Sequence, residues 1–518
     1  MTLSSLDLSI FALYFAVVIG IGIYAARKSV GTQRDYFLAG DKLPWWMVGG
    51  SIVASNLSSH QFVGMTGAAY DRGFVAITAE WAAILIGLNV LLWIFLPFYI
   101  RNGFYTMPEF LQRRFGGAAR VAYASLIILI YIFIEIAAVL YLGAFTLHVL
   151  LGIDMLASII ALAFFTAVYT ITGGLRAVVW TEMLQLGVLI LGGVALSIAV
   201  INEAGGWGNV MATQTEWDLL LPADDMDYPW TQYLGGTLCI SAFYWATNQF
   251  IVQRALAAKN ENHARMGVVF AQYIKFLLPF MTVVPGLMAA KLYPGLAKAD
   301  EAFPTLVENL LPSGLVGLVL AGLIAAIMSH VSGAVNSCTT IASMDFYLPY
   351  IKKDATEQQV VRFGKSVGVV VVLMGIFWAW VLISYSDKPV FIYLMNAYGY
   401  FAAGIAAMFL LGIFWKRATH AGALVAGGLT LPLSAGFDYF WTMPFANRTG
   451  IVFWLCLAGG VVVSLMTRPK TEEQLAGLIW NWRDAFSTEG AQPHGFMRPG
   501  LWCALVTLIV LGMYVRYS

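Results

Sequence analysis

Runs of about twenty apolar residues recur along the whole chain, and this feature restricts the fold more than any other. Hydrophobic residues make up 60% of the chain and charged residues 11%, whereas a soluble domain carries roughly 25% charged residues. In a bilayer only helices and closed barrels pair all their backbone polar groups, and barrel strands alternate over about ten residues. The runs are longer and apolar all round, so they predict an all-α polytopic membrane protein.

These runs predict about fourteen transmembrane helices. Arg27 and Lys28 follow the first run rather than precede it, unlike the charges of a cleaved signal peptide, so this run is predicted to be a retained helix. The four cysteines each lie inside an apolar run and indicate neither a disulfide framework nor a metal cluster. The predicted spans are centred near Val17, Ser55, Gly87, Tyr131, Phe164, Leu189, Ala242, Leu278, Ala325, Val372, Ala403, Leu429, Leu457 and Val510.

The basic residues indicate the orientation of these spans. With the N-terminus outside, 22 of the 29 Lys and Arg residues, Arg254 among them, fall in predicted cytoplasmic loops, 6 fall outside, and Lys275 lies within a span. The predicted external loop, residues 202–228, carries six acidic residues and no Lys or Arg. The chain is therefore expected to span the cell inner (plasma) membrane, with both termini on the outer side. The lipid bilayer is accordingly an expected partner. A net charge of +1 gives no reason to expect a nucleic-acid partner.

Two predicted spans are polar near their middle, at residues 51–61 and 241–249, where Ser, Thr, Asn, His and Gln side chains gather. Transporters with inverted repeats have interrupted helices at matching positions in both halves. These two spans are five apart, which fits two five-helix repeats. The alternative, that the hydroxyl groups only make packing contacts between helices, remains open.

The predicted organisation follows from this spacing. It comprises residues 1–43 as an extra helix and cytoplasmic loop, 44–200 as a first repeat of five helices, 201–228 as the acidic external loop, 229–420 as a second repeat of five helices, and 421–518 as three C-terminal helices.

Four ionisable residues fall within predicted spans: Glu80, Glu135, Glu182 and Lys275. Each costs on the order of 3 kcal/mol in mid-bilayer, so each needs a partner or a wet cavity. Glu80 and Lys275 are expected to share one cavity, where both could bind hydroxyl groups and balance each other's charge. A purely structural ion pair is the alternative, and a structural role is expected for Glu135.

Several segments resemble the sodium/solute symporter family: residues 35–46 (DYFLAGDKLPWW), residues 173–185 (GGLRAVVWTEMLQ), and Ala326 to Ser329 with Asn336-Ser337 and Met344-Asp345. Residues 106–111, 253–259 and 409–416 are similar to its sodium/glucose cotransporter branch. The resemblance implies a LeuT-type fold with inverted five-helix repeats. It also implies cation (sodium)-coupled symport of a sugar or similar polyhydroxylated solute by alternating access.

The resemblance further implies which residues bind the solute. Hydrogen-bonding side chains with aromatic rings over apolar ring faces suit a sugar-like molecule. This chain departs from the family pattern at two positions: Ala79 stands where an aromatic residue of the external gate is expected, and Met395 stands where the family has a sugar-binding Gln. The implied substrate residues are Asn56, Gln61, Glu80, Ser241, Lys275, Met395 and Asn396, and the implied gates are Met65, Tyr244 and Phe391.

The implied sodium site departs from the family pattern at one ligand. Family members hold sodium with backbone carbonyls, here Ala54, Leu57 and Ala326, and with two consecutive serines, here Ser329 and His330. Sodium is a hard cation that prefers oxygen ligands. His330 could rotate away and leave a weakened sodium site, carry a proton near its ordinary pKa, or abolish coupling. Glu182 and Ser332 are expected to assist a cation leaving inward.

Other function classes receive less support from the residues. A membrane sugar sensor would be expected to carry a soluble signalling domain, and the longest predicted cytoplasmic stretch, residues 467–499, is too short for one. The chain has no credible nucleophile–base pair, metal-ligand cluster or Gly-rich phosphate loop, so it is not expected to be an enzyme. Apart from sodium, or a proton, as coupling ion, no cofactor is predicted.

Overall fold

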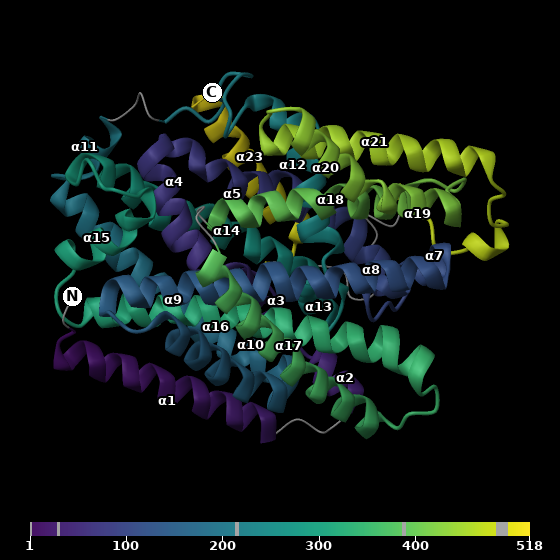
Figure 1. Cartoon of the computed structure of the whole chain (residues 1–518), viewed down its shortest axis with the longest axis horizontal. Helices are drawn as coiled ribbons and strands as arrows, with labels where there is room; N and C mark the ends of the chain where they lie inside the picture. The colour runs from purple at the N-terminus through teal and green to yellow at the C-terminus, as the bar shows by residue number, and fades with distance from the viewer. Residues whose placement is uncertain (1–2, 28–31, 213–216, 386–389, 483–495, 518) are drawn as a thin grey trace.

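The computed structural model of the chain describes residues 3–27, 32–212, 217–385, 390–482 and 496–517. Within these ranges nearly all elements are helices, and the only strand-like pairings are isolated bridges of Leu43 with Ala258 and of Leu221 with Pro229. The helices lie roughly side by side along the long axis, with α1 at the lower edge and α21 at the upper edge (Figure 1). The predicted all-α architecture is confirmed.

The first half of the chain contains α1 (Ser5–Arg27), α2 (Gln33–Leu38), α3 (Trp45–Asn56), η1 (His60–Gly64), α4 (Met65–Arg72), η2 (Gly73–Ile77), α5 (Thr78–Ala82), η3 (Ala83–Leu88), η4 (Leu91–Phe95), α6 (Leu96–Arg101), α7 (Met107–Phe115), α8 (Gly117–Ile130), η5 (Tyr131–Ile136), α9 (Ala137–Leu151), α10 (Met155–Glu203), α11 (Trp207–Met211), η7 (Trp230–Leu234), α12 (Gly236–Ser241), η8 (Ala242–Thr247) and α13 (Gln249–Leu256).

The second half contains α14 (Glu261–Leu292), η9 (Ala299–Glu301), α15 (Ala302–Leu310), α16 (Leu315–Ile341), η10 (Ala342–Ile351), α17 (Glu357–Tyr385), α18 (Val390–Phe414), α19 (His420–Gly428), α20 (Thr430–Phe440), α21 (Phe445–Met466), η11 (Glu473–Leu475) and α23 (Pro499–Arg516).

Ten of these helical stretches are long and apolar enough to cross a membrane, against about fourteen predicted spans. The difference has identifiable causes. The spans predicted at Phe164 and Leu189 both fall within α10, which runs for 49 residues and bends at Gly174. The spans predicted at Ser55, Ala242 and Leu429 fall on shorter helical pieces that are interrupted or joined at a bend.

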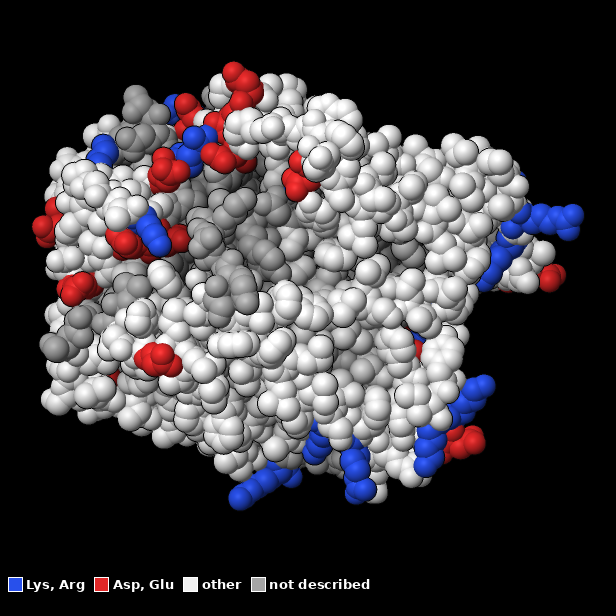
Figure 2. Space-filling model, viewed as in Figure 1, with Lys and Arg blue, Asp and Glu red and all other residues white. Residues whose placement is uncertain are grey.

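The distribution of side chains is that of a protein embedded in lipid. Large apolar residues such as Phe164, Leu191 and Leu373 are about 60% exposed on outward helix faces, while Glu182 and Lys275 are buried. Lys and Arg gather mainly towards the right-hand end in Figure 2, and Asp and Glu mainly towards the left-hand end. Ten apolar helices with charges at the two ends identify an integral membrane protein.

α1, α10 and α16 form one packed group of helices. α10 packs against α16, and α1 packs against both. Asp7 of α1 accepts hydrogen bonds from the backbone N–H groups of Gly314 and Gly317, both at 2.7 Å, and so pairs free donors at the start of α16.

The bend of α10 depends on Gly174. Its φ of 59° with ψ of −159° is a conformation that residues with a side chain rarely adopt. A Cβ placed here would also collide with the backbone oxygen of Tyr36 in α2. The Tyr36 hydroxyl donates to the Ile171 carbonyl at 2.9 Å beside the bend. α2 and the bend therefore fix each other's position.

We predict that Gly174→Ala lowers the melting temperature of the purified protein, because it adds both backbone strain and a collision with Tyr36. The matched control is Gly187→Ala in the same helix, where a Cβ meets nothing within 4 Å. Alanine there should be neutral or stabilising by up to about 1 kcal/mol. Equal melting temperatures for the two variants would show that the bend does not need glycine.

Candidate functional site

The helix that begins at Trp45 is interrupted within the bundle, as its polar residues predict. α3 ends at Asn56, and Leu57 is extended (φ −71°, ψ 123°). The N–H of Ser58, which a continuous helix would bond to the Ala54 carbonyl, is bonded instead to Gln61 Oε1 at 2.9 Å. The Ala54 carbonyl accepts a hydrogen bond from Ser329 Oγ of α16 at 2.8 Å. The interruption therefore releases backbone oxygens next to α16.

A second interruption lies between η8 and α13, at the other polar run. Asn248 is extended (φ −81°, ψ 121°), and its Oδ1 accepts a hydrogen bond from the Phe250 N–H at 3.1 Å. The Tyr131 hydroxyl in η5 donates to the same Oδ1 and accepts from the Phe250 N–H at 3.0 Å. A buried tyrosine and asparagine thus supply the partners that the broken helix lacks.

The two interruptions contact each other through Asn56 and Tyr244. Asn56 Nδ2 donates to the Tyr244 hydroxyl at 3.0 Å. Met65, at the start of α4, and Ser241, at the end of α12, are buried on these same interrupted segments. Side chains of Phe391, Met395 and Asn396 lie outside the described residues, so their implied roles stay predictions.

Glu80 and Lys275 form a buried ion pair between α5 and α14. Their side chains are 7% and 1% exposed, and the Lys275 ammonium lies 5.0 Å from the centre of the Trp245 ring in η8. The attraction of a cation to an aromatic face adds to the ion pair. This pair thereby connects the interrupted segment η8 with two other helices.

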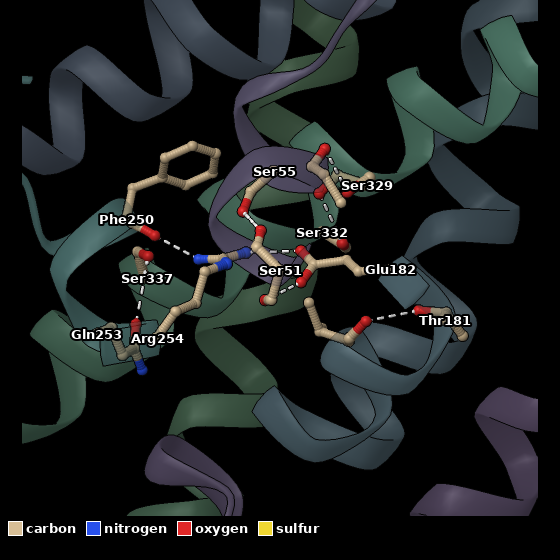
Figure 3. Close-up of polar contacts among 12 residues, drawn as sticks. Ser51, Ser55, Thr181, Glu182, Phe250, Gln253, Arg254, Ser329, Ser332 and Ser337 are labelled. Carbon is tan, nitrogen blue, oxygen red and sulfur yellow. Dashed lines mark hydrogen bonds and ion pairs between the residues drawn. The ribbon is translucent and has the colours of Figure 1, made fainter. Parts of the chain in front are cut away.

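Glu182 has a partner that the sequence did not suggest. Arg254 Nη2 lies 2.7 Å from Glu182 Oε1, and both side chains are fully buried. The Ser51 hydroxyl donates to the other oxygen of Glu182, and Arg254 also donates to the Phe250 carbonyl (Figure 3). Arg254 lies within α13 rather than in the loop that was predicted for it, and its guanidinium is the counter-charge of the buried Glu182 carboxylate.

His330 turns towards a carboxylate. Its Nε2 lies 2.6 Å from Glu135 Oε2, and its ring centre lies 5.1 Å from that of Phe250. Ser332, one turn along α16, donates to the Ser329 carbonyl at 2.8 Å. Ser329, the residue before His330 in α16, thus contacts the first interruption through the Ala54 carbonyl. The Glu135 contact was missed, because no sequence pattern relates η5 to α16.

The sequence motifs outside this centre are also joined by hydrogen bonds. Thr106 Oγ1 and Arg120 Nε both donate to Asp345 Oδ1, at 2.9 and 2.7 Å. Gln253 Nε2 donates to the Phe37 carbonyl at 2.6 Å. Segments far apart in the chain are therefore joined by buried polar contacts. No group of three or more potential metal-binding side chains occurs among the described residues.

The chain matches a known family over most of its length. The sequence model of the "Sodium:solute symporter family" matches residues 36–430. A sodium/glucose cotransporter of Vibrio parahaemolyticus is 37% identical over 479 residues, covering 86% of this chain and 88% of that protein. The human sodium/myo-inositol cotransporter is 33% identical over 558 residues, covering 95% of this chain and 77% of that protein.

A solved structure has a similar fold at low sequence identity. The outward-open, substrate-bound structure of a Na+-coupled sialic acid symporter superposes with a TM-score of 0.83 and 22% identity, covering 90% of this chain and 99% of that chain. At this identity the similarity establishes the arrangement of helices.

We predict that Arg254→Ala destabilises the protein strongly, because it leaves the Glu182 carboxylate buried without its counter-charge. Removing one partner of a buried pair costs about 3–5 kcal/mol. The melting temperature of purified protein measures this loss. The control is Lys416→Ala, since Lys416 and its partner Glu472 have side chains 69% and 92% exposed, and exposed pairs contribute about 0–1 kcal/mol.

The double variant Glu182→Gln, Arg254→Met removes both charges and should recover part of the lost melting temperature. An Arg254→Ala protein as stable as Lys416→Ala would contradict a tightly coupled buried pair.

Proposed function

Because this chain belongs to the sodium:solute symporter family, we propose that it is a secondary active transporter that couples sodium entry to uptake of a polyhydroxylated solute. One observation carries the proposal: two interrupted helices meet through Asn56 and Tyr244 at the centre of the bundle. Interrupted helices at mid-membrane supply the free backbone groups and cavities that transporters use for solutes and ions. Relatives named as cotransporters favour symport over a sensor.

We propose a fourteen-span topology with inverted five-helix repeats, in which α10 supplies two spans, the two interrupted helices one each, and α19 with α20 one more. The bend at Gly174 and the two extended residues, Leu57 and Asn248, support this division. The repeats would occupy residues 44–200 and 229–420, between the regions 1–43, 201–228 and 421–518.

We propose that both termini face outward across the plasma membrane. The backbone N–H of Leu219, in the acidic loop, donates to the Tyr517 carbonyl at 2.8 Å, so the C-terminus lies beside that loop. The gathering of basic side chains at the opposite end supports the same orientation (Figure 2).

The solute is proposed to bind next to the Glu80–Lys275 pair. The pair offers an acceptor and a donor, which suits a molecule with many hydroxyl groups. Gln61 Oε1 is engaged with Ser58, so its amide N–H groups are the donors proposed to face the solute. Asn56, Ser241, Met395 and Asn396 complete the proposed set, and Tyr244, Met65 and Phe391 are its proposed gates.

The coupling sodium is proposed to bind at the first interruption. The carbonyls of Ala54, Leu57 and Ala326 and the hydroxyl of Ser329 provide oxygen ligands, which a hard cation prefers. His330 is the position at which the ligand set departs from oxygen. Glu182 and Ser332 are proposed to assist a cation leaving inward, for which Glu182 would have to exchange Arg254 for the passing cation.

The proposal predicts that reconstituted protein concentrates at least one of D-glucose, myo-inositol and sialic acid inside liposomes only under an inward sodium gradient. Radiolabelled uptake with sodium outside, compared with equal sodium on both sides, measures this. No accumulation of any of the three probes would overturn the proposed coupling for this solute class.

Lys275→Ala should reduce that uptake by about tenfold or more, because it removes a hydrogen-bond donor and leaves Glu80 unpaired. The control is Lys291→Ala in the same helix, where the side chain is exposed and uptake should be unchanged. Uptake is normalised to the amount of folded protein inserted. Equal uptake by the two variants would remove Lys275 from the site.

A further inference from the structure

The buried contact between His330 and Glu135 has no assigned role. Nε2 of His330 and Oε2 of Glu135 are 2.6 Å apart, and their side chains are 5% and 3% exposed. His330 lies in α16, while Glu135 lies in the π-helical turn η5 between α8 and α9. Single π-turns inside helices occur frequently at functional sites. The contact therefore joins two helices at a π-helical turn.

The Glu135 contact is the directed bond that orients the imidazole. Within the described part of the chain, His330 Nδ1 has no hydrogen-bond partner. The Phe250 ring, 5.1 Å away between centres, packs against the imidazole without a hydrogen bond. Loss of the carboxylate would leave both ring nitrogens buried and unpaired, and a buried N–H without an acceptor is costly.

Backbone acceptors lie next to Ser329, the residue before His330 in α16. His330 directly follows Ser329, whose hydroxyl reaches the Ala54 carbonyl at 2.8 Å. That carbonyl lacks the N–H of Ser58, which is bonded to Gln61. Leu57 is extended at the same break, so the end of α3 exposes further carbonyl oxygens towards α16. An imidazole N–H released from Glu135 would find acceptors among the same oxygens that are proposed to hold sodium.

We propose that Glu135 is a positioning residue of the cation site, which holds the imidazole of His330 away from the space beside Ala54 and Ser329. The oxygen ligands there stay available to sodium although His330 replaces a hydroxyl-bearing ligand. This inference deepens the proposed function and rests on it. It assigns to Glu135 a role that acts through His330, with no contact of its own to the cation.

Sodium binding is measured apart from transport, as the rise in melting temperature of detergent-purified protein when sodium replaces potassium at constant ionic strength. Wild type should be stabilised by sodium. Glu135→Ala should raise the half-saturating sodium concentration about tenfold or more, because the freed imidazole competes for the ligands. Glu135→Gln keeps an acceptor oxygen, so its half-saturating sodium concentration should be close to that of wild type.

The double variant Glu135→Ala, His330→Ser should restore the half-saturating concentration to the wild-type value or below, since no imidazole remains to be held. A merely structural role of Glu135 would not be rescued in this way. The control is Thr146→Ala in α9, a buried residue whose hydroxyl donates to the carbonyl of Leu142 one turn away. It should not change sodium binding.

An unchanged half-saturating sodium concentration in folded Glu135→Ala would overturn the positioning role. So would a double variant Glu135→Ala, His330→Ser that binds sodium as weakly as Glu135→Ala alone. If His330→Ser responds to sodium and wild type does not, the imidazole fills the site despite Glu135, and the inference fails while the proposed transporter stands. If neither responds, sodium coupling fails together with the inference.

Discussion

A backbone that leaves the helical path inside a bilayer must find other partners for its N–H and C=O groups, and this requirement organises the centre of the molecule. At the first interruption the Gln61 side chain accepts a hydrogen bond from the Ser58 N–H, and the Ser329 hydroxyl donates to the Ala54 carbonyl. At the second, Tyr131 and Asn248 satisfy the Phe250 N–H. Polar side chains that would be unfavourable in lipid are thus retained because the broken helices need them.

Buried ionisable side chains provide a second set of contacts between the helices. Glu80 is paired with Lys275, Glu182 with Arg254, and Glu135 with His330, and each pair joins helices distant in sequence. A charge left alone in this environment would cost several kcal/mol, so the partners cannot separate without replacement. In a transporter that alternates between two states, such pairs are where solute, cation and conformation can influence one another.

Much of the fold could be predicted from the sequence, because long apolar runs permit only helices in lipid and because polar runs mark where helices break. The Glu80–Lys275 contact was also accessible, since both residues lie in spans and carry opposite charges. The partner of Glu182 could not be predicted from the sequence, because Arg254 follows a polar run at a position where a cytoplasmic loop was expected. The Glu135–His330 contact depends on tertiary packing that no local pattern encodes. Assignments of substrate and cation ligands stay predictions.

The central claim is that sodium and solute bind interdependently around the two interruptions. It is tested most directly by titrating purified protein with D-glucose and myo-inositol in sodium and in potassium of equal ionic strength. Linkage requires that each ligand tightens the other by the same factor, typically about 5- to 150-fold. The account predicts at least about fivefold tighter binding of one of these solutes in sodium, with a reciprocal effect on sodium affinity. Equal affinities in sodium and potassium would contradict it.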